Sequence, residues 1–163
     1  LKYLKDAAAT LDKTIADLSK ESTSYENKSS QAFSARQGLL KMPVKGKIVS
    51  TYGTYVEPQS GATNFRKGIE IQADRGAPIS AVYGGQIVYA DWLKGYGNVI
   101  IITHGDNYYT VYAHAEDLFR KKGDNVEADD VIATVGDTGS ILRYDGASWR
   151  LIRMKTSIMN WAA

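Results

Sequence analysis

The stretch Gly84–His114 decides the fold class, and it reads GGQIVYADWLKGYGNVIIITHGDNYYTVYAH. It contains three short runs rich in Val, Ile and Tyr, at Gln86–Trp92, Val99–His104 and Tyr108–His114. Glycines separate the runs, and Gly105-Asp106-Asn107 is typical of a tight hairpin turn. Short β-branched and aromatic runs divided by turn residues predict antiparallel strands.

The same pattern continues on both sides of this stretch. Further β-rich runs lie at Lys47–Tyr52, Gly68–Ile71, Pro78–Val82, Val131–Val135 and Trp149–Met154. Many short strands with few helical patterns predict a mainly β domain built on an antiparallel, barrel-like sheet. We therefore expect two parts: a helical segment and hinge over residues 1–40, and a β domain over residues 41–163.

Residues 1–25 have helical periodicity. Apolar residues recur in alternating steps of three and four, at Leu1, Leu4, Ala8, Leu11, Ile15 and Leu18. This spacing is typical of a coiled-coil seam, and it predicts the end of a longer coiled coil. The alternative is an amphipathic helix packed on its own domain. The polar segment 21–31 predicts a hinge, and 32–40 predicts a second short helix.

Composition sets limits on function. The chain has 163 residues, 44% of them hydrophobic, which suits one modest domain with an appendage. A net charge of +2 without a basic cluster argues against nucleic acid as a partner. The chain has no cysteine, so disulfides and thiolate metal sites are excluded. It begins with Leu1, and we expect it to be a fragment whose export signal lies upstream.

The stretch NFRKGIEIQAD, residues 64–74, has some of the chemistry of a metal site but not all of it. Glu70 and Asp74 could supply oxygen ligands, yet Arg66 and Lys67 place two positive charges beside them. A catalytic zinc needs three protein ligands and an open position. The stretch therefore predicts a site that does not hold zinc.

From Gly68 onward the sequence resembles a known family. The motifs GGQIVYADWLKGYGN, THG, YAH, KKGDNV and VGDTGS occur in family order, and the likeness covers about residues 42–160. The run resembles the LytM domain of the M23 peptidases. The resemblance implies an antiparallel β-sheet fold of the duplicated-hybrid-motif type. Active members of the family are zinc endopeptidases that cut cell-wall peptide cross-bridges.

The family's ligand set can be compared residue by residue. Active members carry His-x-Gly-x-Asp, and here Arg66 stands in the His place and Glu70 in the Asp place. The later His-x-His falls on Ala147 and Trp149, or with a shift of one residue on Ser148 and Arg150. Of the family set, His114 in Tyr-Ala-His remains. The resemblance therefore implies no metal, no cofactor and no peptidase activity.

Two motifs point to one branch of degenerate LytM domains. KMPVKGKIVSTYG at the entry and ADWLKGYGN resemble the EnvC-type murein hydrolase activators. That likeness implies a groove that binds and activates a cell-wall amidase in the periplasm. It also implies that the coiled coil docks on a division-associated membrane transporter complex and can mask the groove. Carried over to this chain, the groove contacts are Lys67, Tyr96, His104, Trp149 and Arg153.

Two other functions stay open at this point. The domain could be a peptidoglycan-binding or structural module of the envelope that activates no amidase. It could also be a residual zinc endopeptidase, although Arg66 and the missing His-x-His argue against that.

Overall fold

The computed structural model describes residues 2–21, 33–36, 38–66, 68–105, 108–139 and 149–153. For residues 2–5 and 149–153 it describes the backbone alone. The elements are α1 (Lys2–Glu21), β1 (Lys47–Ser50), β2 (Gly53–Val56), β3 (Thr63–Arg66), β4 (Ile69–Gln72), β5 (Pro78–Ser80), β6 (Gly85–Leu93), β7 (Gly97–Thr103), β8 (Tyr109–Leu118), β9 (Asn125–Val126), β10 (Val131–Val135) and β11 (Trp149–Arg153).

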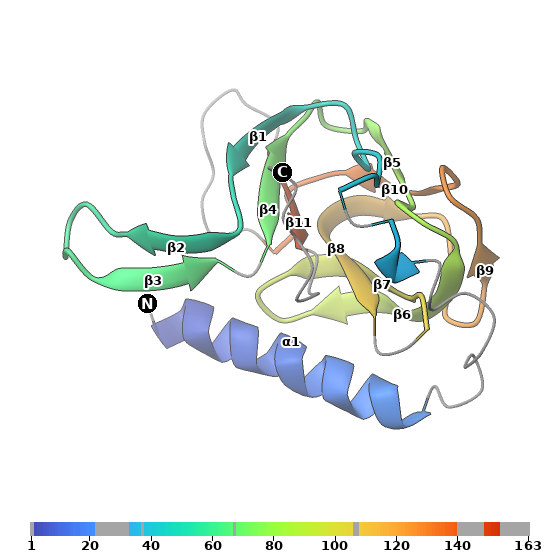
Figure 1. Ribbon diagram of the computed structural model, residues 1–163, viewed down its shortest axis with the longest axis horizontal. Coiled ribbons are helices and arrows are strands. Elements are labelled where there is room, and N and C mark those ends of the chain that lie inside the picture. The colour runs from blue at the N-terminus through green and yellow to red at the C-terminus, as the bar shows by residue number, and fades with distance from the viewer. Residues whose placement is uncertain are drawn as a thin grey trace.

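One antiparallel sheet of nine strands forms the body of the molecule. Its main path runs β1-β4-β11-β8-β7-β6-β9, and β10 joins it by pairing with both β8 and β5. Because β10 bridges the middle of this path to β5, the sheet curls over on itself (Figure 1). The predicted fold class, a mainly β antiparallel domain with an N-terminal helix, is confirmed.

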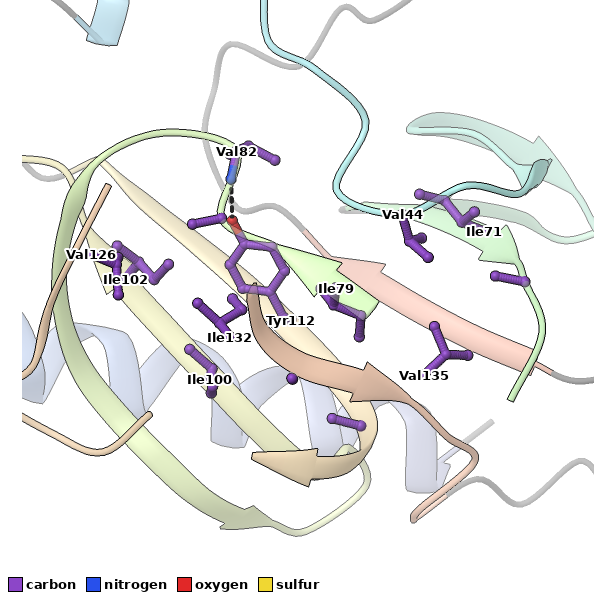
Figure 2. Packing of buried hydrophobic residues seen from close by; sticks show 14 of the residues in the cluster. Val44, Ile71, Ile79, Val82, Ile100, Ile102, Tyr112, Val126, Ile132 and Val135 are labelled. Carbon is purple, nitrogen blue, oxygen red and sulfur yellow. Dashed lines mark hydrogen bonds between the residues drawn. The ribbon is translucent and has the colours of Figure 1, made fainter. Parts of the chain in front are cut away.

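The core lies inside the curl. Side chains from β4, β5, β6, β7, β8 and β10 meet there, and the largest are Ile71, Ile79, Ile87, Ile100, Ile102, Tyr112 and Ile132, most of which Figure 2 labels. Each of these is at most 1% exposed. Burying one such side chain contributes about 1.5–3 kcal/mol, so this cluster is the main source of stability.

Strand β7 is buried on both faces, which explains its unbroken apolar run. Ile100 and Ile102 point into the curl, whereas Val99 and Ile101 belong to a second cluster on the outer face. Successive residues of a strand alternate between faces, so a strand covered on both sides has apolar residues throughout.

Helix α1 covers that outer face (Figure 1). Ala7, Leu11, Ile15 and Leu18 of the helix are buried in the cluster that also contains Val99, Ile101 and Val111 of the sheet. The predicted helix is thus confirmed, and Leu11, Ile15 and Leu18 of the seam proposed for a coiled coil pack on the chain's own sheet. Ala7 is buried there, whereas the predicted seam residue Ala8 is half-buried, and the side chains of Leu1 and Leu4 lie outside the described residues. The 3-4 spacing is common to both arrangements, and the structure shows the amphipathic alternative.

Between α1 and β1 the predicted short helix is reduced to a single turn. Phe33 and Ser34 are helical, and the Arg36 N–H donates to the Phe33 carbonyl at 3.0 Å. Gly38 has a φ of 76°, a backbone conformation that favours glycine and stops the helix. The predicted boundary at residue 41 stays a prediction, since α1 and Phe33 both contact the β domain.

The hairpin of β2 and β3 was not predicted. It forms a separate two-stranded sheet that projects beside the main sheet (Figure 1). The predicted strand 47–52 ends at Ser50, because the chain turns at Gly53, whose φ is 123°. Within the hairpin Tyr52 packs edge-on against Phe65, with ring centroids 5.0 Å apart.

Candidate functional site

The strand order brings the family's metal-site positions together. Glu70 lies in β4, Trp149 in β11 and His114 in β8, and β11 is hydrogen-bonded to both β4 and β8. In the register, Trp149 is opposite Gln72 and Leu151 is opposite Glu70. Arg66 ends β3, just before β4. Glu70, His114 and Trp149 therefore share one region of the main sheet, whereas Arg66 belongs to the separate β2–β3 sheet and Ala147 lies outside the described residues.

His114 occupies an irregular point of β8. Asn98 pairs with Ala115 while Ile100 pairs with Tyr112, so β8 has one extra residue between these pairs, which is a β-bulge. His114 has a φ of 59°, in the left-handed region that non-glycine residues rarely adopt. Its N–H donates to the Tyr96 carbonyl at 2.8 Å. The bulge turns the half-buried imidazole away from the regular face of the strand.

One contact fixes the tautomer of His114. Its Nδ1 lies 2.6 Å from the Thr138 carbonyl oxygen. A carbonyl only accepts, so Nδ1 must donate and in the neutral ring the lone pair is on Nε2. Metal-binding and catalytic histidines are oriented in the same way by a carbonyl or carboxylate.

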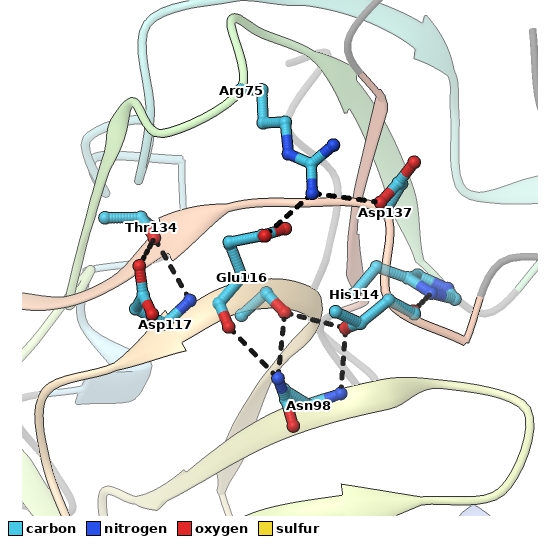
Figure 3. Close-up of polar contacts among 9 residues, drawn as sticks. Arg75, Asn98, His114, Glu116, Asp117, Thr134 and Asp137 are labelled. Atoms are coloured by element: carbon cyan, nitrogen blue, oxygen red, sulfur yellow. Dashed lines mark hydrogen bonds and ion pairs between the residues drawn. The ribbon is translucent and has the colours of Figure 1, made fainter.

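The support for His114 comes from the Gly97-Asn98 and Thr138-Gly139 segments (Figure 3). Asn98 Nδ2 donates to the carbonyls of Ala115, at 3.2 Å, and Glu116, at 3.1 Å. The Thr138 hydroxyl donates to the Ala115 carbonyl at 2.6 Å and accepts from the Asn98 N–H at 3.0 Å. These bonds hold the bulge in place, and our sequence analysis did not identify either residue.

Close backbone contact explains the glycines of both segments. A Cβ on Gly97 would lie 2.1 Å from the Thr138 carbonyl oxygen, and one on Gly139 would lie 2.3 Å from the Gly97 nitrogen. Both glycines also have positive φ. The two motifs YGN and VGDTGS therefore pack directly on each other, a signal that could have identified Asn98 and Thr138.

A group of ion pairs lies beside the hydrogen bonds of Asn98 and Thr138 that hold the β-bulge. Arg75 Nη2 lies 2.7 Å from Glu116 Oε1 and 3.9 Å from Asp137 Oδ1 (Figure 3). The hydrogen bond and charge of Glu116 raise the pKa of Arg75. The group is largely exposed, so it ties the loop after β10 to β8 without strong stabilisation.

Arg66 and Glu70 do not pair with each other. The Arg66 guanidinium carbon lies 3.8 Å from the centroid of the Tyr55 ring, a cation–π contact within the hairpin. The sequence also favoured an ion pair of Glu70 with Arg66 or Lys67. Among the described residues the half-buried Glu70 has no ion pair, so the pair with Arg66 is not formed, and the pair with Lys67 stays a prediction. Lys67 itself lies outside the described part of the chain.

The donor set does not fit the zinc of active M23 enzymes. Across the residues with described side chains, no group of three or more His, Cys, Asp or Glu could hold a metal ion. The positions in question supply a guanidinium at Arg66, one carboxylate at Glu70 and an indole at Trp149. A guanidinium donates hydrogen bonds and stays charged, so it repels a cation.

The predicted groove residues fall into two regions. Tyr96 lies near His114, with ring centroids 6.3 Å apart, and is 1% exposed in the cluster that α1 covers. Trp149 and Arg153 lie on β11 between β4 and β8. His104 lies at the opposite end of the β7–β8 pair from His114. The structure thus brings Tyr96 and β11 to the His114 region but places His104 elsewhere.

His104 is a buried residue held by a closed set of hydrogen bonds. Its Nδ1 lies 2.7 Å from the Gly84 carbonyl oxygen, and its Nε2 lies 2.9 Å from the Thr110 hydroxyl. The Thr110 hydroxyl is 3.2 Å from the Tyr112 hydroxyl, which accepts from the Val82 N–H at 3.1 Å. A neutral imidazole that donates through Nδ1 and accepts at Nε2 satisfies every group.

Burial decides whether His104 and Tyr112 are charged. It lowers the pKa of His104 to about 4, despite the opposing effect of the Gly84 hydrogen bond. Burial likewise raises the pKa of Tyr112 to about 12. Both groups are neutral near neutral pH, which suits a structural role.

The fold and site together define a class: a curled antiparallel-sheet domain of metallopeptidase type in which the metal positions carry other residues. Residues 64–148 match the family model described as Peptidase family M23. The chain belongs to peptidase family M23.

Two curated proteins have sequences similar to this chain. Murein hydrolase activator NlpD of Salmonella dublin is 35% identical over 140 residues, which is 81% of this chain and 35% of that protein. The uncharacterized lipoprotein YgeR of Escherichia coli K12 is 43% identical over 102 residues, covering 62% of this chain and 38% of that protein. The chain therefore spans about a third of the length of these relatives.

A solved enzyme structure has the same fold. The catalytic domain of the antimicrobial peptidase lysostaphin from Staphylococcus simulans superposes with a TM-score of 0.53 at 25% identity, over 79% of this chain and 90% of that one. The activators named above are NlpD proteins, so the finer assignment to the EnvC-type branch stays a prediction. Among the described helices, α1 is not long and apolar enough to cross a bilayer.

Proposed function

We propose that this chain is a non-catalytic activator of a peptidoglycan amidase, an N-acetylmuramoyl-L-alanine amidase, in bacterial cell-wall remodelling and daughter-cell separation. The observation that carries the proposal is the replaced ligand set of an otherwise intact M23 fold, with Arg66 in the His place. Metal-assisted hydrolysis needs an open cation to activate water, and this donor set does not hold one. The name of the NlpD relatives supports the same function.

The region around β4, β11 and β8 is the proposed amidase-binding groove. Lys67, Trp149 and Arg153 supply cationic and aromatic groups, the residue types that dominate interface energies. Such a surface suits an amphipathic helix with acidic residues, and we propose that it captures the inhibitory segment of the amidase. His104 is 0% exposed, so its side chain contributes to the groove after a rearrangement at most.

Helix α1 is the proposed mask of this groove. Tyr96, one of the predicted contacts, is buried in the cluster that α1 forms with the outer face of the sheet. A partner helix that contacts Tyr96 would therefore compete with α1. In the longer protein the same helix would have to leave the sheet before its seam could join a coiled coil that docks on the transporter complex.

The proposed location is the periplasm or cell envelope. The relative YgeR is described as a lipoprotein, and an outer membrane antigenic lipoprotein B of Histophilus somni is 39% identical over 114 residues. A substrate in the cell wall requires the same compartment.

Stimulation of a purified envelope amidase on purified peptidoglycan tests the function. We expect no release of soluble fragments by the chain alone and faster release by the amidase in its presence. Lys67→Glu and Arg153→Glu should reduce stimulation at least tenfold if each removes about 1.4 kcal/mol of binding free energy. Lys121→Glu, an exposed charge on the loop after β8, is the matched control.

Other outcomes point to other functions. Unchanged stimulation by both groove variants would refute the groove. Sedimentation with purified cell wall, without stimulation of any amidase, would instead favour a peptidoglycan-binding or structural module. Zinc bound at one equivalent, together with cleavage of peptide cross-bridges, would favour a residual endopeptidase.

A further inference from the structure

An aromatic pocket lies at the His104 end of the β7–β8 pair, away from the proposed groove. Its walls are Tyr83, His104 and Tyr108, and the side chain inside it is Phe33, which is 4% exposed. The Phe33 ring lies parallel to the imidazole of His104, with centroids 4.5 Å apart and an interplanar angle of 5°. It meets Tyr83 edge-on at 5.5 Å and Tyr108 at 5.3 Å.

The floor of this pocket is rigid. Both ring nitrogens of His104 are hydrogen-bonded, to Gly84 and to Thr110. A Cβ on Gly85 would lie 2.2 Å from the Thr103 carbonyl oxygen and 3.1 Å from His104 Nδ1, so backbone packs directly against the imidazole. A floor that cannot rotate offers a fixed surface for stacking, and such pairs contribute beyond the area they bury.

Phe33 is close in the chain to the end of α1, so its burial in the pocket attaches the connection after α1 to the domain. Phe33 follows the end of α1 at Glu21, and the next buried residue after it is Pro43, whose carbonyl accepts from the Ser80 N–H at 2.8 Å. Leu39, Lys41 and Met42 between them are exposed, whereas Leu40 is half-buried and packs on the main core cluster. Phe33 is thus the first point after α1 where the described chain is held by the body of the domain.

We propose that the pocket of Tyr83, His104 and Tyr108 is a binding site for one aromatic side chain, and that Phe33 is an anchor that sets how far α1 can move from its sheet. With Phe33 in place, the connection from α1 to the domain is about 12 residues, from 21 to 33; without it, the connection is about 19 residues, from 21 to Leu40, which packs on the core. The effective concentration of α1 at its own sheet falls roughly as the −3/2 power of this length.

The expected consequence is a measurable change in α1 occupancy. Loss of the anchor lowers the closing equilibrium of α1 by about two-fold, from the ratio of 19 to 12 residues raised to 3/2. The inference concerns the chain's own packing, so it stands or falls independently of any amidase.

Fluorine NMR tests the pocket. The chain has three Phe, so 4-fluorophenylalanine labelling gives three resonances. Phe33→Leu and Phe119→Leu assign two of them, and Phe119 is the matched control because its side chain is 56% exposed. We expect the Phe33 signal to be shifted by ring currents and protected from a soluble paramagnetic agent, and the Phe119 signal to be accessible.

Hydrogen exchange with an insertion tests the anchor. Ten Gly/Ser residues inserted after Gly38 should leave the protection of α1 amides unchanged when Phe33 is present. The same insertion in Phe33→Leu should lower α1 protection by a further factor of about 1.9, from 29 against 19 residues. Amides of β7 report global unfolding and provide the reference in each variant.

Three results would overturn the proposal. The first is a solvent-accessible Phe33 signal in the unmodified chain. The second is an insertion that lowers α1 protection equally with and without Phe33. The third is a loss of α1 protection in Phe33→Leu that only follows the loss at β7.

Discussion

At the scale of single residues, a network of hydrogen bonds holds His114 in a fixed position. His114 retains a left-handed backbone and a fixed tautomer, both held by Thr138 and Asn98. A non-glycine residue in that conformation costs about 1–3 kcal/mol, and the surrounding hydrogen bonds must offset it. This support comes from β7, β8 and the loop after β10, and none of its bonds involves the predicted metal-site positions Arg66 and Glu70.

A pair of glycine variants measures that support. Gly97 and Gly61 have almost the same φ, 66° and 67°, but a Cβ on Gly97 meets the Thr138 carbonyl while one on Gly61 meets nothing within 4 Å. We expect Gly97→Ala to destabilise the domain by about 1–3 kcal/mol more than Gly61→Ala, measured by urea denaturation. Gly97→Ala should also shift the imidazole resonances of His114. Equal costs would contradict the packing of the two motifs.

His104 predicts a dependence of stability on pH. Its pKa is about 4 in the folded protein against 6.5 as the ordinary value, so the unfolded chain takes up the proton first as the pH falls. Its contribution to stability is fully present above pH 6.5, and about 3 kcal/mol is lost by pH 4. Denaturation at several pH values should show a flatter profile for His104→Gln across this window. Parallel profiles for the two proteins would contradict the prediction.

At the scale of elements, the sequence predicted most strands and the helix but not their partners. Runs such as Val99–His104 are visible because β7 is apolar throughout, being buried on both faces. The β2–β3 hairpin was not predicted because its strands combine polar and apolar residues and are largely exposed. Strand β9 has only two residues, too few to form a pattern. The 3-4 spacing of α1 is the same for a coiled coil and for packing on a sheet, so the sequence could not decide.

For the candidate site, too, the sequence indicated individual residues but not which of them lie together. The resemblance placed Glu70 and His114 on strands of the main sheet that β11 joins, whereas Arg66 ends β3 in the separate two-stranded sheet. It also grouped His104 with the groove contacts Tyr96, Trp149 and Arg153, although His104 lies at the far end of the β7–β8 pair. Distance along a strand is not visible in a list of motif positions, whereas burial and register in the structure show it directly.

The packing of α1 leads to a prediction about masking. Leu11 is buried against the sheet and Lys13 is exposed on the same helix. Leu11→Asp places a charge at the interface and should detach α1, at a cost of more than about 3 kcal/mol to its packing. We expect higher amidase stimulation from Leu11→Asp and no change from Lys13→Asp. Equal stimulation by the two variants, with α1 detached in the first as judged by hydrogen exchange, would refute masking.

At the scale of the whole molecule, an intact fold with a changed ligand set can be converted back. We expect Arg66→His with Glu70→Asp, combined with Ala147→His and Trp149→His, to bind zinc and to stabilise the domain. At a zinc concentration of 100 times Kd the gain is about 2.7 kcal/mol, measured by thermal unfolding with and without a chelator. The unmodified chain should show no shift with zinc.

The one-residue alternative provides the control for that experiment. Ser148→His with Arg150→His, on the same background, should leave zinc affinity low if Trp149 holds the family position. Stronger zinc binding by this second set would correct the alignment of the last strand. Failure of both sets would contradict the view that β4, β8 and β11 still form a metal scaffold.

The two-sided burial of β7 has a consequence for how such a protein can diversify. Even-numbered positions such as Ile100 and Ile102 face the core, and odd-numbered positions such as Val99 and Ile101 face α1. Substitutions at the odd positions change how tightly the sheet packs against α1, while the packing of the core stays the same. In the proposed masking arrangement, the odd positions of β7 therefore set the free energy of releasing α1, and they can change during evolution while the positions that face the core stay the same.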